Sequence, residues 1–582
     1  MNYNKLAELL FPHIDKTPAD YEVLYPPREE GKVITRLGPS PTGFIHLGNL
    51  YGAFVDERLA HSGADTGTFY LRIEDTDDRR FVEGAVETII NSLNFFDINF
   101  DEGATLPKSG QAAYGESEQG AYGPYFQSKR EHIYQTYIKD MVSKGLAYPC
   151  FLTEDELTAI RDNQEANKET TGIYGRYAEK SRNLSLEEIL ANINAGQSYV
   201  IRLKSDGNRM TDETGSIIID DEGKPKIRYI TVDDAIRGKL SMPANYQDVV
   251  ILKANGIPTY HFAHVIDDHL MRTTHVVRGD EWLMSLPIHI ELFEKLGFEP
   301  PTYCHTAVLM KVDEETGNRR KLSKRKDPEL SLDYYRNEGY HPQAVKEYML
   351  TILNSDFEEW RAENPHAHID EFEFTTDKMS SGGALFDLNK LNDISKDVLL
   401  KLPATELADF MIKWAAEFKP KVLPLLNGSS GNPAYSKDYL EKILDLGRDE
   451  IKPRKDLIFA RQIFEFVGYF YDEYFVIEER IPEQVSDEDA KEILERYMQS
   501  YNHGDEQSQW FDKIRTIAAN MGYAAKPRDY KKNPEEYKGH VGHVSTVIRI
   551  AVMGRSQSPD LWAIQQILGE ERTRGRIAEL IG

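Results

Sequence analysis

The sequence predicts a multidomain protein in which an interrupted α/β portion is followed by an all-α C-terminal region. Length is the first reason, because the chain has 582 residues and single hydrophobic cores stop growing at about 250–300 residues. The second is a strand-like run, a tight loop and a helical pattern that follow one another between residues 32 and 61. The third is that strand patterns nearly vanish from about Ser395 onward, where helical stretches succeed one another.

The composition indicates folded domains with an acidic surface. Hydrophobic residues make up 40% of the chain, which is enough apolar material for packed cores. The formal net charge is −26, which disfavours nonspecific binding of polyanions. Any contact with nucleic acid should therefore be confined to a local basic face and should weaken with salt.

The two cysteines, Cys150 and Cys304, are too few and too far apart for a disulfide framework or a four-cysteine zinc site. This usage fits a reducing cytoplasm. No basic start is followed by an apolar signal segment, and no run of about 18–20 apolar residues occurs. We therefore expect a cytoplasmic protein without a membrane span.

The first 31 residues form an N-terminal extension. Leu6, Leu9 and Leu10 predict a short amphipathic helix, and the Pro26-Pro27 pair predicts a linker after it. The sequence indicates no function for this segment.

The stretch Arg36–Leu50, RLGPSPTGFIHLGNL, is predicted to be the loop between a strand and a helix. Its two prolines exclude regular structure, and Gly43 and Gly48 permit positive φ angles or close approach of the backbone to a ligand. The following helix directs its N-terminal amides at the loop, which favours anions, and His46 adds a donor there. A phosphate-binding loop is one interpretation, and an ordinary turn with His46 on the surface is the other.

The next predicted strand, Thr68–Glu74, places carboxylates at its end, beside that loop. For Asp77 and Asp78 a polar turn that caps the next helix is the favoured interpretation. Gly103–Gly123 is rich in Gly, Ser, Ala and Glu and lacks an apolar period, which predicts a flexible surface loop.

Apolar periodicity and capping residues predict a further series of elements downstream. They are helix Ile133–Leu146, capping boxes at Thr153/Glu156 and Ser185/Glu188, strands near Tyr199–Leu203 and Ile217–Asp220, and helices Leu286–Leu296, Ala404–Phe418, Asp456–Tyr471, Asp489–Tyr501 and Leu561–Ile581. Asp267, Asp268 and His269 are expected to hydrogen-bond a turn rather than bind metal, because three consecutive residues do not share one face.

A second distinctive stretch, Arg319–Lys326, has six basic residues in eight positions. Basic clusters usually form a solvated face or a nucleic-acid patch. Here, however, HLGN and KLSKR together resemble the two signature sequences of class I aminoacyl-tRNA synthetases, HIGH and KMSKS. Six motifs occur in the order found in bacterial glutamyl-tRNA synthetases: RLGPSPTGFIHLGN, LRIEDTD, GPYFQSKR, PTYHFAHVIDDHLM, THVVRGDEWL and KLSKRKD. The resemblance runs from about Lys32 to the C-terminus and is firmest up to Asp387.

This resemblance implies a Rossmann-like catalytic domain with an α+β connective insertion, followed by an all-α anticodon-binding region. It divides the chain into the N-terminal extension (1–31), the first half of the catalytic domain (32–130), the insertion that grips the tRNA acceptor end (131–255), the second half of the catalytic domain (256–312), a stem-contact domain with the KLSKR loop (313–394) and the anticodon-binding region (395–582). The helical end fits bacterial glutamyl enzymes, whereas glutaminyl and archaeal-type glutamyl enzymes end in β-barrels.

The resemblance also implies the site residues, carried over position by position. The implied catalytic residues are His46 and Lys324. The implied ATP-binding residues are Gly43, His46, Gly48, Lys321, Ser323, Lys324 and Arg325. The implied glutamate-binding residues are Arg36, Ser40, Glu74, Tyr260, His264 and Arg278.

Arg278 is physically suited to its role, because a guanidinium can clamp a carboxylate with two hydrogen bonds. The alternative is that Arg278 pairs with Asp280 or Glu281. His264 departs from the family, which often has asparagine at that position. Without their motif, Tyr260 and His264 would be interpreted as half-buried core residues.

The implied reaction is activation of L-glutamate by ATP to glutamyl-adenylate, then transfer to the 3′ end of tRNA(Glu). It needs no enzyme nucleophile, because the substrate carboxylate attacks the α-phosphorus, and catalysis consists of alignment and stabilisation of phosphate charge. Mg²⁺ accompanies the triphosphate, and related enzymes activate glutamate only with tRNA bound. Some relatives bind zinc in the insertion through several cysteines. This chain offers only Cys150 there, so we expect no zinc, no protein-bound metal site, and a monomer.

Two rival interpretations stay open. A glutaminyl-tRNA synthetase would resemble EPNG and FDDTN where this chain has SPTG and IEDTD. A catalytically inactive tRNA-binding paralogue is opposed by the presence of four residues: His46, Lys324, Glu74 and Arg278.

Overall fold

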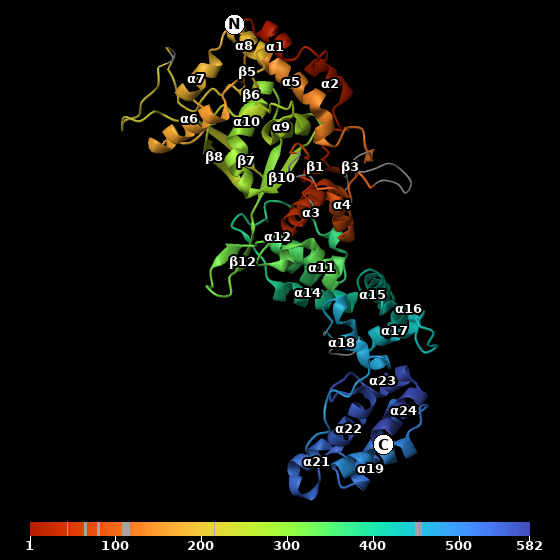
Figure 1. Ribbon diagram of the computed structural model, residues 1–582. Helices are drawn as coiled ribbons and strands as arrows, with labels where there is room; N and C mark the ends of the chain where they lie inside the picture. Colours follow the sequence, from red (N-terminus) through yellow and green to blue (C-terminus); the bar gives the residue numbers. More distant parts are fainter. Residues whose placement is uncertain are drawn as a thin grey trace. The chain divides into compact units, whose positions relative to one another are not determined.

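The computed structural model describes the chain from Met1 to Gly582 except residues 43–44, 63–66, 78–81, 107–116, 213, 215, 449–452, 454 and 456. The chain forms two compact units (Figure 1). Unit 1 comprises Met1–Tyr334 and Met349–Asp387, and unit 2 comprises Tyr335–Tyr348 and Leu388–Gly582. The division therefore falls inside α11 (Leu332–Glu338) and α12 (Pro342–Leu353).

Unit 1 is built on parallel strands. Their bounds are β1 (Ile34–Leu37), β2 (Thr68–Leu71), β3 (Glu102–Ala104), β10 (His275–Gly279) and β11 (Thr302–Thr306), and β4 (Glu118–Gln119) is an antiparallel edge strand next to β3. β1 pairs with β2, β2 with β3, and β10 with β11. A 3.0 Å hydrogen bond from the Thr274 main-chain N–H to the Ile34 carbonyl joins the two sets. Every residue of β1 is buried, as expected for parallel strands covered on both faces.

Helices cover these strands. Their bounds are α3 (Leu47–His61), α4 (Ala85–Phe95), α5 (Glu131–Ser143), α9 (Tyr260–Leu270) and α10 (Leu286–Leu296), and a further helix of unit 1, α13 (Phe357–Glu363), follows later in the chain. α3 packs against β1, β2 and β10. One buried cluster joins α5, α9 and α10 through Tyr134, Phe262 and Phe293. α10 ends at Gly297, whose φ of 73° is the left-handed conformation that glycine favours.

Between α5 and α9 the chain forms a segment with small sheets of its own. Its elements are β5 (Ala147–Cys150), α6 (Glu154–Ala166), α7 (Arg176–Arg182), α8 (Leu186–Asn194), β6 (Val200–Leu203), β7 (Tyr229–Asp234), β8 (Gly238–Pro243) and β9 (Val250–Leu252). β5, β6 and β9 form an antiparallel sheet. β7 and β8 form a hairpin (Figure 1), and β7 contacts β11. The hairpin therefore reaches the parallel strands.

The N-terminal extension is part of the core of unit 1. α1 (Tyr3–Leu10) and α2 (Pro18–Leu24) both contact α5. Leu6, Leu10 and Tyr21 belong to the same buried cluster as α5. Glu22 Oε2 accepts from Arg272 Nη2 at 2.8 Å, so the extension is also tied to the end of α9.

Unit 1 closes with a small mixed sheet of β12 (Leu309–Val312), β13 (Arg319–Lys321) and β14 (Ala384–Leu385). β12 pairs antiparallel with β13 and parallel with β14.

The described residues of unit 2 form helices joined by turns and loops, with no strand among them. Its helices, besides the parts of α11 and α12, are α14 (Leu388–Lys401), α15 (Ala404–Phe418), α16 (Leu423–Asn427), α17 (Lys437–Asp445), α18 (Ile463–Val467), α19 (Asp487–Ser500), α20 (Gln507–Asn520), α21 (Pro527–Lys532), α22 (Val541–Met553), α23 (Leu561–Leu568) and α24 (Glu570–Ile581). One buried cluster includes Trp414, Tyr471, Trp510 and Ile548. None of the described helices of either unit is long and apolar enough to cross a bilayer.

The predicted fold class is confirmed, and so are several elements. α10 and α15 have the predicted bounds, and α5 and α19 begin two residues before the predicted ones. The capping boxes at Thr153/Glu156 and Ser185/Glu188 are both formed. The amphipathic helix predicted around Leu6 is α1.

Other predicted elements are wrong. Ile217–Asp220 is not a strand: it makes only isolated bridges, to Thr211 and Pro225, and the side chains of Ile217 and Ile219 are exposed. The Ile218 main-chain N–H donates to the Met210 carbonyl at 2.9 Å and the Ile218 carbonyl accepts from the Lys226 N–H at 2.8 Å, but in the described residues these contacts do not extend into a strand pairing. The strand predicted to reach Glu74 ends at Leu71. The loop predicted over Gly103–Gly123 contains the end of β3 and all of β4, with residues 107–116 outside the description.

Two predicted helices are interrupted. Leu561–Ile581 is split into α23 and α24 by Gly569, which has φ 85°. Within the described part of the segment predicted over Asp456–Tyr471, only Ile463–Val467 is α-helical, between two short 3-10 turns. The aromatic and β-branched residues of this segment have weak helix propensity, and Gly468 lies among them.

Candidate active site

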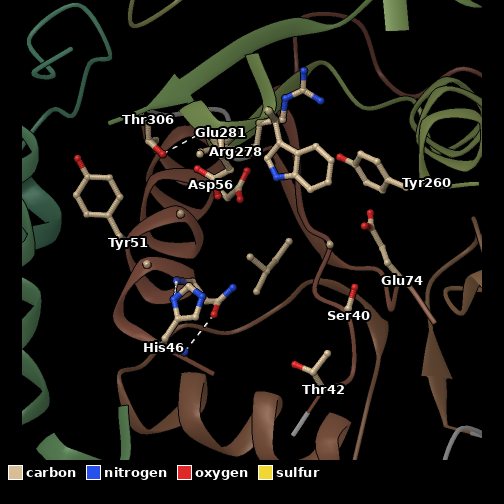
Figure 2. A pocket seen from close by; sticks show the side chains of 18 of the residues that line it. Ser40, Thr42, His46, Tyr51, Asp56, Glu74, Tyr260, Arg278, Glu281 and Thr306 are labelled. Carbon is tan, nitrogen blue, oxygen red and sulfur yellow. Dashed lines mark hydrogen bonds between the residues drawn. The ribbon is translucent and has the colours of Figure 1, made fainter. Parts of the chain in front are cut away.

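A cavity of about 690 Å³ lies where β1 and β10 end and α3 begins. The loop after β1, one face of α3, the first residue of α9 and the residues that follow β10 and β11 line it. Figure 2 shows His46 on one side of the cavity and Glu74 and Tyr260 across from it. Ligands of open α/β sheets bind at this edge, outside the carboxyl ends of the strands.

His46 caps the N-terminus of α3. Its Nδ1 accepts from the Asn49 main-chain N–H at 3.3 Å, and its own main-chain N–H donates to Asn49 Oδ1 at 3.1 Å. A Cβ on Gly48 would lie 3.0 Å from the imidazole, so glycine lets the ring lie against the helix. Burial and the charge of Lys321 lower the pKa of His46. The ring is therefore neutral at pH 7, and its Nε2–H joins the first amides of α3 as donors suited to phosphate.

Asp268 on α9 holds two arginines beneath the cavity. Arg36 Nε donates to Asp268 Oδ1 at 3.2 Å, and Arg72 Nη1 donates to the same oxygen at 2.7 Å. Burial opposes the charge of Asp268, but Arg36 and Arg72 hold its pKa well below the usual range. Arg36 itself lines the cavity, so Asp268 fixes a cation that faces any ligand there.

The expectation that Asp267, Asp268 and His269 hydrogen-bond a turn holds only for Asp268, whose Oδ1 accepts from Thr273 Oγ1 at 3.1 Å in the turn after α9; the principal partners of all three lie elsewhere. All three lie on α9, and the two carboxylates are fully buried. Asp267 Oδ1 accepts from Arg130 Nε at 2.7 Å, and His269 Nε2 lies 2.7 Å from Glu22 Oε1. The helix turns the two carboxylates toward two different arginine partners, which buries both charges in pairs.

Glu74 forms the wall opposite His46 (Figure 2). Its Oε1 accepts from Arg72 Nη2 at 3.0 Å, and a Cβ on Gly38 would lie 2.5 Å from that oxygen. Glycine at this position therefore lets the loop pass close to the carboxylate. Burial raises the pKa of Glu74, and the nearby arginines oppose that shift. Ser40 lines the same wall.

Tyr260 begins α9 and lines the cavity, with its ring centre 4.4 Å from that of Trp282. His264, one turn later, is fully buried behind it: the two rings stack with centres 5.8 Å apart. His264 Nε2 lies 3.1 Å from the Tyr303 hydroxyl, and Nδ1 lies 2.5 Å from Asp268 Oδ2. Burial lowers the pKa of His264 to about 3. The structure thus places His264 where it supports the wall rather than on the wall.

Arg278, at the end of β10, is a buried cation whose hydrogen bonds go to neutral groups. Nε donates to His305 Nε2 at 2.9 Å, Nη1 lies 3.1 Å from His289 Nδ1, and the guanidinium lies 4.6 Å above the Tyr303 ring. Nη2 is buried and has no hydrogen-bond partner in the described part of the chain.

The alternative pairing of Arg278 with Asp280 or Glu281 is not found among the described residues. Asp280 Oδ2 accepts instead from Arg237 Nη2 at 2.8 Å. Arg278 is therefore a cation at the cavity wall, and no ion pair with a described carboxylate neutralises it.

Lys321, at the end of β13, lines the cavity. The turn after it is fixed by Asp327, which accepts from the Ser323 main-chain N–H at 2.8 Å and from Arg320 Nη1 at 2.6 Å. The hydrogen bonds from Arg320 lower the pKa of Asp327 to about 2. Three predicted ATP-binding residues lie on this turn, beyond the cavity walls as described: Ser323, Lys324 and Arg325.

The structure adds a residue that the sequence analysis missed. Gly48, Gly52 and Asp56 follow one another at four-residue spacing on one face of α3, and all line the cavity. Both Asp56 carboxylate oxygens are buried and lack a hydrogen-bond partner within the described structure. Burial raises the pKa of Asp56 well above its usual value. The spacing was visible in the sequence, but the burial was not.

The predicted site residues fall into three groups. Those that line the cavity are Arg36, Ser40, His46, Gly48, Glu74, Tyr260, Arg278 and Lys321. Gly43 lies outside the described residues. Those placed behind or beyond its walls are His264, Ser323, Lys324 and Arg325.

This arrangement can bind a ligand with two chemically different ends. At one end, the start of α3, His46 and Lys321 offer donors and positive charge to phosphate groups. At the other end, Arg278 can receive a carboxylate, and Glu74 can receive a cation.

Comparisons with known proteins identify the family. Residues 32–393 match the family described as tRNA synthetases class I (E and Q), catalytic domain, and residues 406–581 match an anticodon binding domain. A glutamate–tRNA ligase of Acetivibrio thermocellus is 58% identical over 584 aligned positions that cover all of both chains. One from Clostridium perfringens strain 13 is 47% identical, covering 99% of this chain and 100% of its own.

A solved structure agrees. The crystal structure of a glutamate tRNA ligase from Elizabethkingia meningosepticum in complex with its amino acid superposes with a TM-score of 0.68 at 27% identity, covering 94% of this chain and 99% of that one. Because the catalytic-domain family spans more than half of the chain and relatives align along its whole length, the chain belongs to the class I tRNA synthetases (E and Q), among the glutamate–tRNA ligases.

Proposed function

We propose that this protein activates L-glutamate with ATP to glutamyl-adenylate and transfers the glutamyl group to the 3′ end of tRNA(Glu) for protein synthesis. The observation that carries the proposal is Arg278. A buried charge is costly unless it is paired. Arg278 lines the cavity, and its guanidinium has one buried nitrogen without a hydrogen-bond partner and no carboxylate partner in the described structure. A γ-carboxylate supplied by the substrate would complete it.

The remaining wall residues suit the rest of glutamate. Glu74 would help to hold the α-amino group, and Arg36 and Ser40 would complete the amino-acid site. Arg36 is oriented for this by its 3.2 Å hydrogen bond to Asp268. Tyr260 would close the side of the pocket. For His264 we propose a supporting role behind Tyr260 in place of a direct contact.

ATP would lie with its phosphates at the start of α3. His46 and Lys324 would stabilise charge that develops on the phosphates, Gly43 and Gly48 would allow close approach of the backbone, and Lys321 would add positive potential. Ser323 and Arg325 would assist from the turn after β13. Because Lys324 lies beyond the cavity walls in this structure, its role requires the turn to approach the phosphates when ATP binds.

Mg²⁺ would enter with ATP. No group of three His, Cys, Asp or Glu side chains in the described residues is arranged to hold a metal ion, and Mg²⁺ is commonly held by substrate phosphates and water with few protein ligands. Bound in this way, it would neutralise the triphosphate.

The chemistry needs alignment rather than a nucleophile from the enzyme. A glutamate α-carboxylate oxygen attacks the α-phosphorus, and pyrophosphate leaves. A hydroxyl of the terminal tRNA ribose then attacks the carbonyl of the adenylate, and AMP leaves. The side chains around the cavity would hold the reactants in line and stabilise charge on the phosphate oxygens.

The rest of the chain would bind tRNA. We propose that residues 131–255 contact the acceptor end, residues 313–394 the stem and residues 395–582 the anticodon. The match of residues 406–581 to an anticodon binding domain supports the last assignment. We further infer a monomer in the cytoplasm, and the two buried, free cysteines fit a reducing compartment.

Exchange of radiolabelled pyrophosphate into ATP tests the activation step and the choice of amino acid. With tRNA(Glu) and Mg²⁺ present, glutamate should support exchange and glutamine should not. Exchange with glutamine alone would favour a glutaminyl enzyme, and no exchange with either amino acid would favour an inactive tRNA-binding protein.

A further inference from the structure

Arg278 belongs to a chain of hydrogen bonds that crosses several elements of unit 1. Asp234 Oδ2, at the end of β7, lies 2.6 Å from His305 Nδ1 on β11, and both side chains are fully buried. His305 Nε2 accepts from Arg278 Nε at 2.9 Å. On the other side, Arg278 Nη1 lies 3.1 Å from His289 Nδ1 on α10, and His289 Nε2 lies 3.0 Å from His261 Nδ1 on α9.

The chain has one direction, because a guanidinium only donates hydrogen bonds. His305 must accept at Nε2, so its proton is on Nδ1, where Asp234 accepts it. His289 must accept at Nδ1, so its Nε2–H donates to His261. Burial lowers the pKa of both His305 and His289. Both rings are therefore neutral acceptors at pH 7, and they leave the charge of Arg278 available to a ligand.

Asp234 is held in place independently of Arg278. Its Oδ1 accepts from two main-chain N–H groups of the following turn, at 3.0 and 2.9 Å. Its Oδ2 accepts from the His305 main-chain N–H at 3.1 Å as well as from the ring. The Ala235 main-chain N–H donates to the Tyr303 carbonyl at 2.9 Å, which joins the end of β7 to β11. The carboxylate is thus a fixed acceptor that faces Nδ1 of His305.

We propose that Asp234 and His305 are positioning residues for Arg278: the carboxylate fixes the tautomer of the histidine, and the histidine holds the guanidinium with its unpartnered nitrogen directed at the substrate carboxylate. This inference rests on the proposed function, since it assigns the orientation of the group that selects glutamate. Because β7 belongs to the segment 131–255, the chain of bonds also ties that segment to the amino-acid end of the cavity.

Asp234→Asn tests the tautomer directly. Asparagine keeps one carbonyl oxygen for the main-chain N–H groups of the turn, but turns an NH₂ group toward His305 Nδ1 and toward the His305 main-chain N–H. The ring would then have to carry its proton on Nε2, where it opposes the donor of Arg278. Asp233→Asn is the matched control, because it makes the same change on the neighbouring, exposed residue of β7.

Two substitutions of His305 separate hydrogen bonding from packing. In His305→Gln the carboxamide can still accept from Arg278 and donate to Asp234. In His305→Leu the side chain has similar bulk but does neither. The double variant Asp234→Asn with His305→Leu asks whether Asp234 acts through the histidine.

The measurement is pyrophosphate exchange in the presence of tRNA(Glu), with KM for glutamate, KM for ATP and kcat determined for each variant. Asp234→Asn and His305→Leu should each raise KM for glutamate about 10- to 100-fold, the range expected for loss of a hydrogen bond to a charged group. KM for ATP should stay within about threefold, a free-energy change well below that of one such bond. Asp233→Asn and His305→Gln should stay close to wild type, and the double variant should be no worse than His305→Leu.

Equal glutamate constants for Asp234→Asn and Asp233→Asn would overturn the proposal, as would glutamate and ATP constants that rise together, or a full additional loss in the double variant. If Asp234→Asn does not fold, equal behaviour of His305→Gln and His305→Leu would overturn it. Absence of glutamate-dependent exchange in the wild-type enzyme would count against the proposed function instead.

Discussion

Replacing Arg278 with alanine should remove most of the catalytic efficiency for glutamate. The guanidinium is buried, makes hydrogen bonds to two neutral imidazoles and has one nitrogen without a described partner. A γ-carboxylate would therefore receive two charge-assisted bonds, each contributing about 1.5–3 kcal/mol. Their loss amounts to about 3–6 kcal/mol, or about 10²–10⁴-fold in kcat/KM.

The same variant should lose its preference for glutamate over glutamine. A site built to satisfy one polar group can reject analogues by about 10⁴–10⁵-fold, because the amide NH₂ of glutamine would face a partner that only donates. Stability should change little: the bonds to His305 and His289 are lost, but a buried charge without an ion-pair partner in the described structure is lost too.

The assay is steady-state pyrophosphate exchange with both amino acids, together with the melting temperature. KM for ATP should be unchanged, and the melting temperature should shift by no more than about 4 °C, roughly the effect of 1 kcal/mol in a domain of this size. Arg176→Ala is the control, since that arginine is exposed and pairs with Glu169 at 2.8 Å. Glutamate kinetics that survive the change, or a variant that merely unfolds, would refute the selectivity role.

Three further predictions concern other residues. His46→Ala and Lys324→Ala should each lower kcat about 10²–10³-fold with little change in KM for glutamate. His46→Asn, which can still cap α3, separates the catalytic effect from the loss of the helix cap, which costs about 1 kcal/mol. Unchanged turnover in both alanine variants would show that His46 and Lys324 have no catalytic role. The protein should contain no stoichiometric zinc, because Cys150 has no nearby cysteine in the sequence and a structural site needs about four ligands; one zinc per chain by elemental analysis would contradict this. Asp56→Asn should raise the melting temperature at pH 7. In the wild type the folded protein keeps a proton on Asp56 that the unfolded chain loses above about pH 4, so the wild type loses stability as the pH rises from there toward the raised folded-state pKa of Asp56. A variant that is less stable than wild type at pH 7 would contradict this.

Local signals predicted the elements whose causes are local. α10 has its predicted bounds because its apolar residues recur at helical spacing and Gly297 ends it in the left-handed conformation. The loop before α3 was predicted from its glycines and its prolines, and the structure adds that His46 caps the helix. Gly569 shows the limit of such signals, because one glycine within a helical pattern can be tolerated or can end the helix, and here it ends α23.

Features that depend on distant partners could not be predicted. Asp267 and Asp268 were assigned to a turn, whereas their partners, Arg130 and Arg36, lie more than a hundred positions away along the chain. Sequence spacing alone does not show that such charges meet in a core.

The sequence predicted only part of the candidate site, because some of its placements also depend on residues that are distant along the chain. The motifs identified residues that line the cavity, including Glu74 and Arg278. They did not show that His264 lies behind Tyr260, or that Lys324 lies on a turn beyond the walls, because both placements depend on packing between elements. Asp234 and His305, which form the hydrogen-bond chain on one side of Arg278, lie outside the positions that the motifs assign to the site.

Charging of tRNA tests the central claim most directly. Radiolabelled glutamate is incubated with ATP, Mg²⁺, the protein and either tRNA(Glu) or tRNA(Gln) under reducing conditions, and acid-precipitable glutamyl-tRNA is counted. The account predicts ATP-dependent glutamylation of tRNA(Glu) by the wild type and its loss in Arg278→Ala, and the tRNA(Gln) arm shows whether that tRNA is charged as well. Absence of glutamyl-tRNA(Glu) from the wild-type reaction would contradict the account.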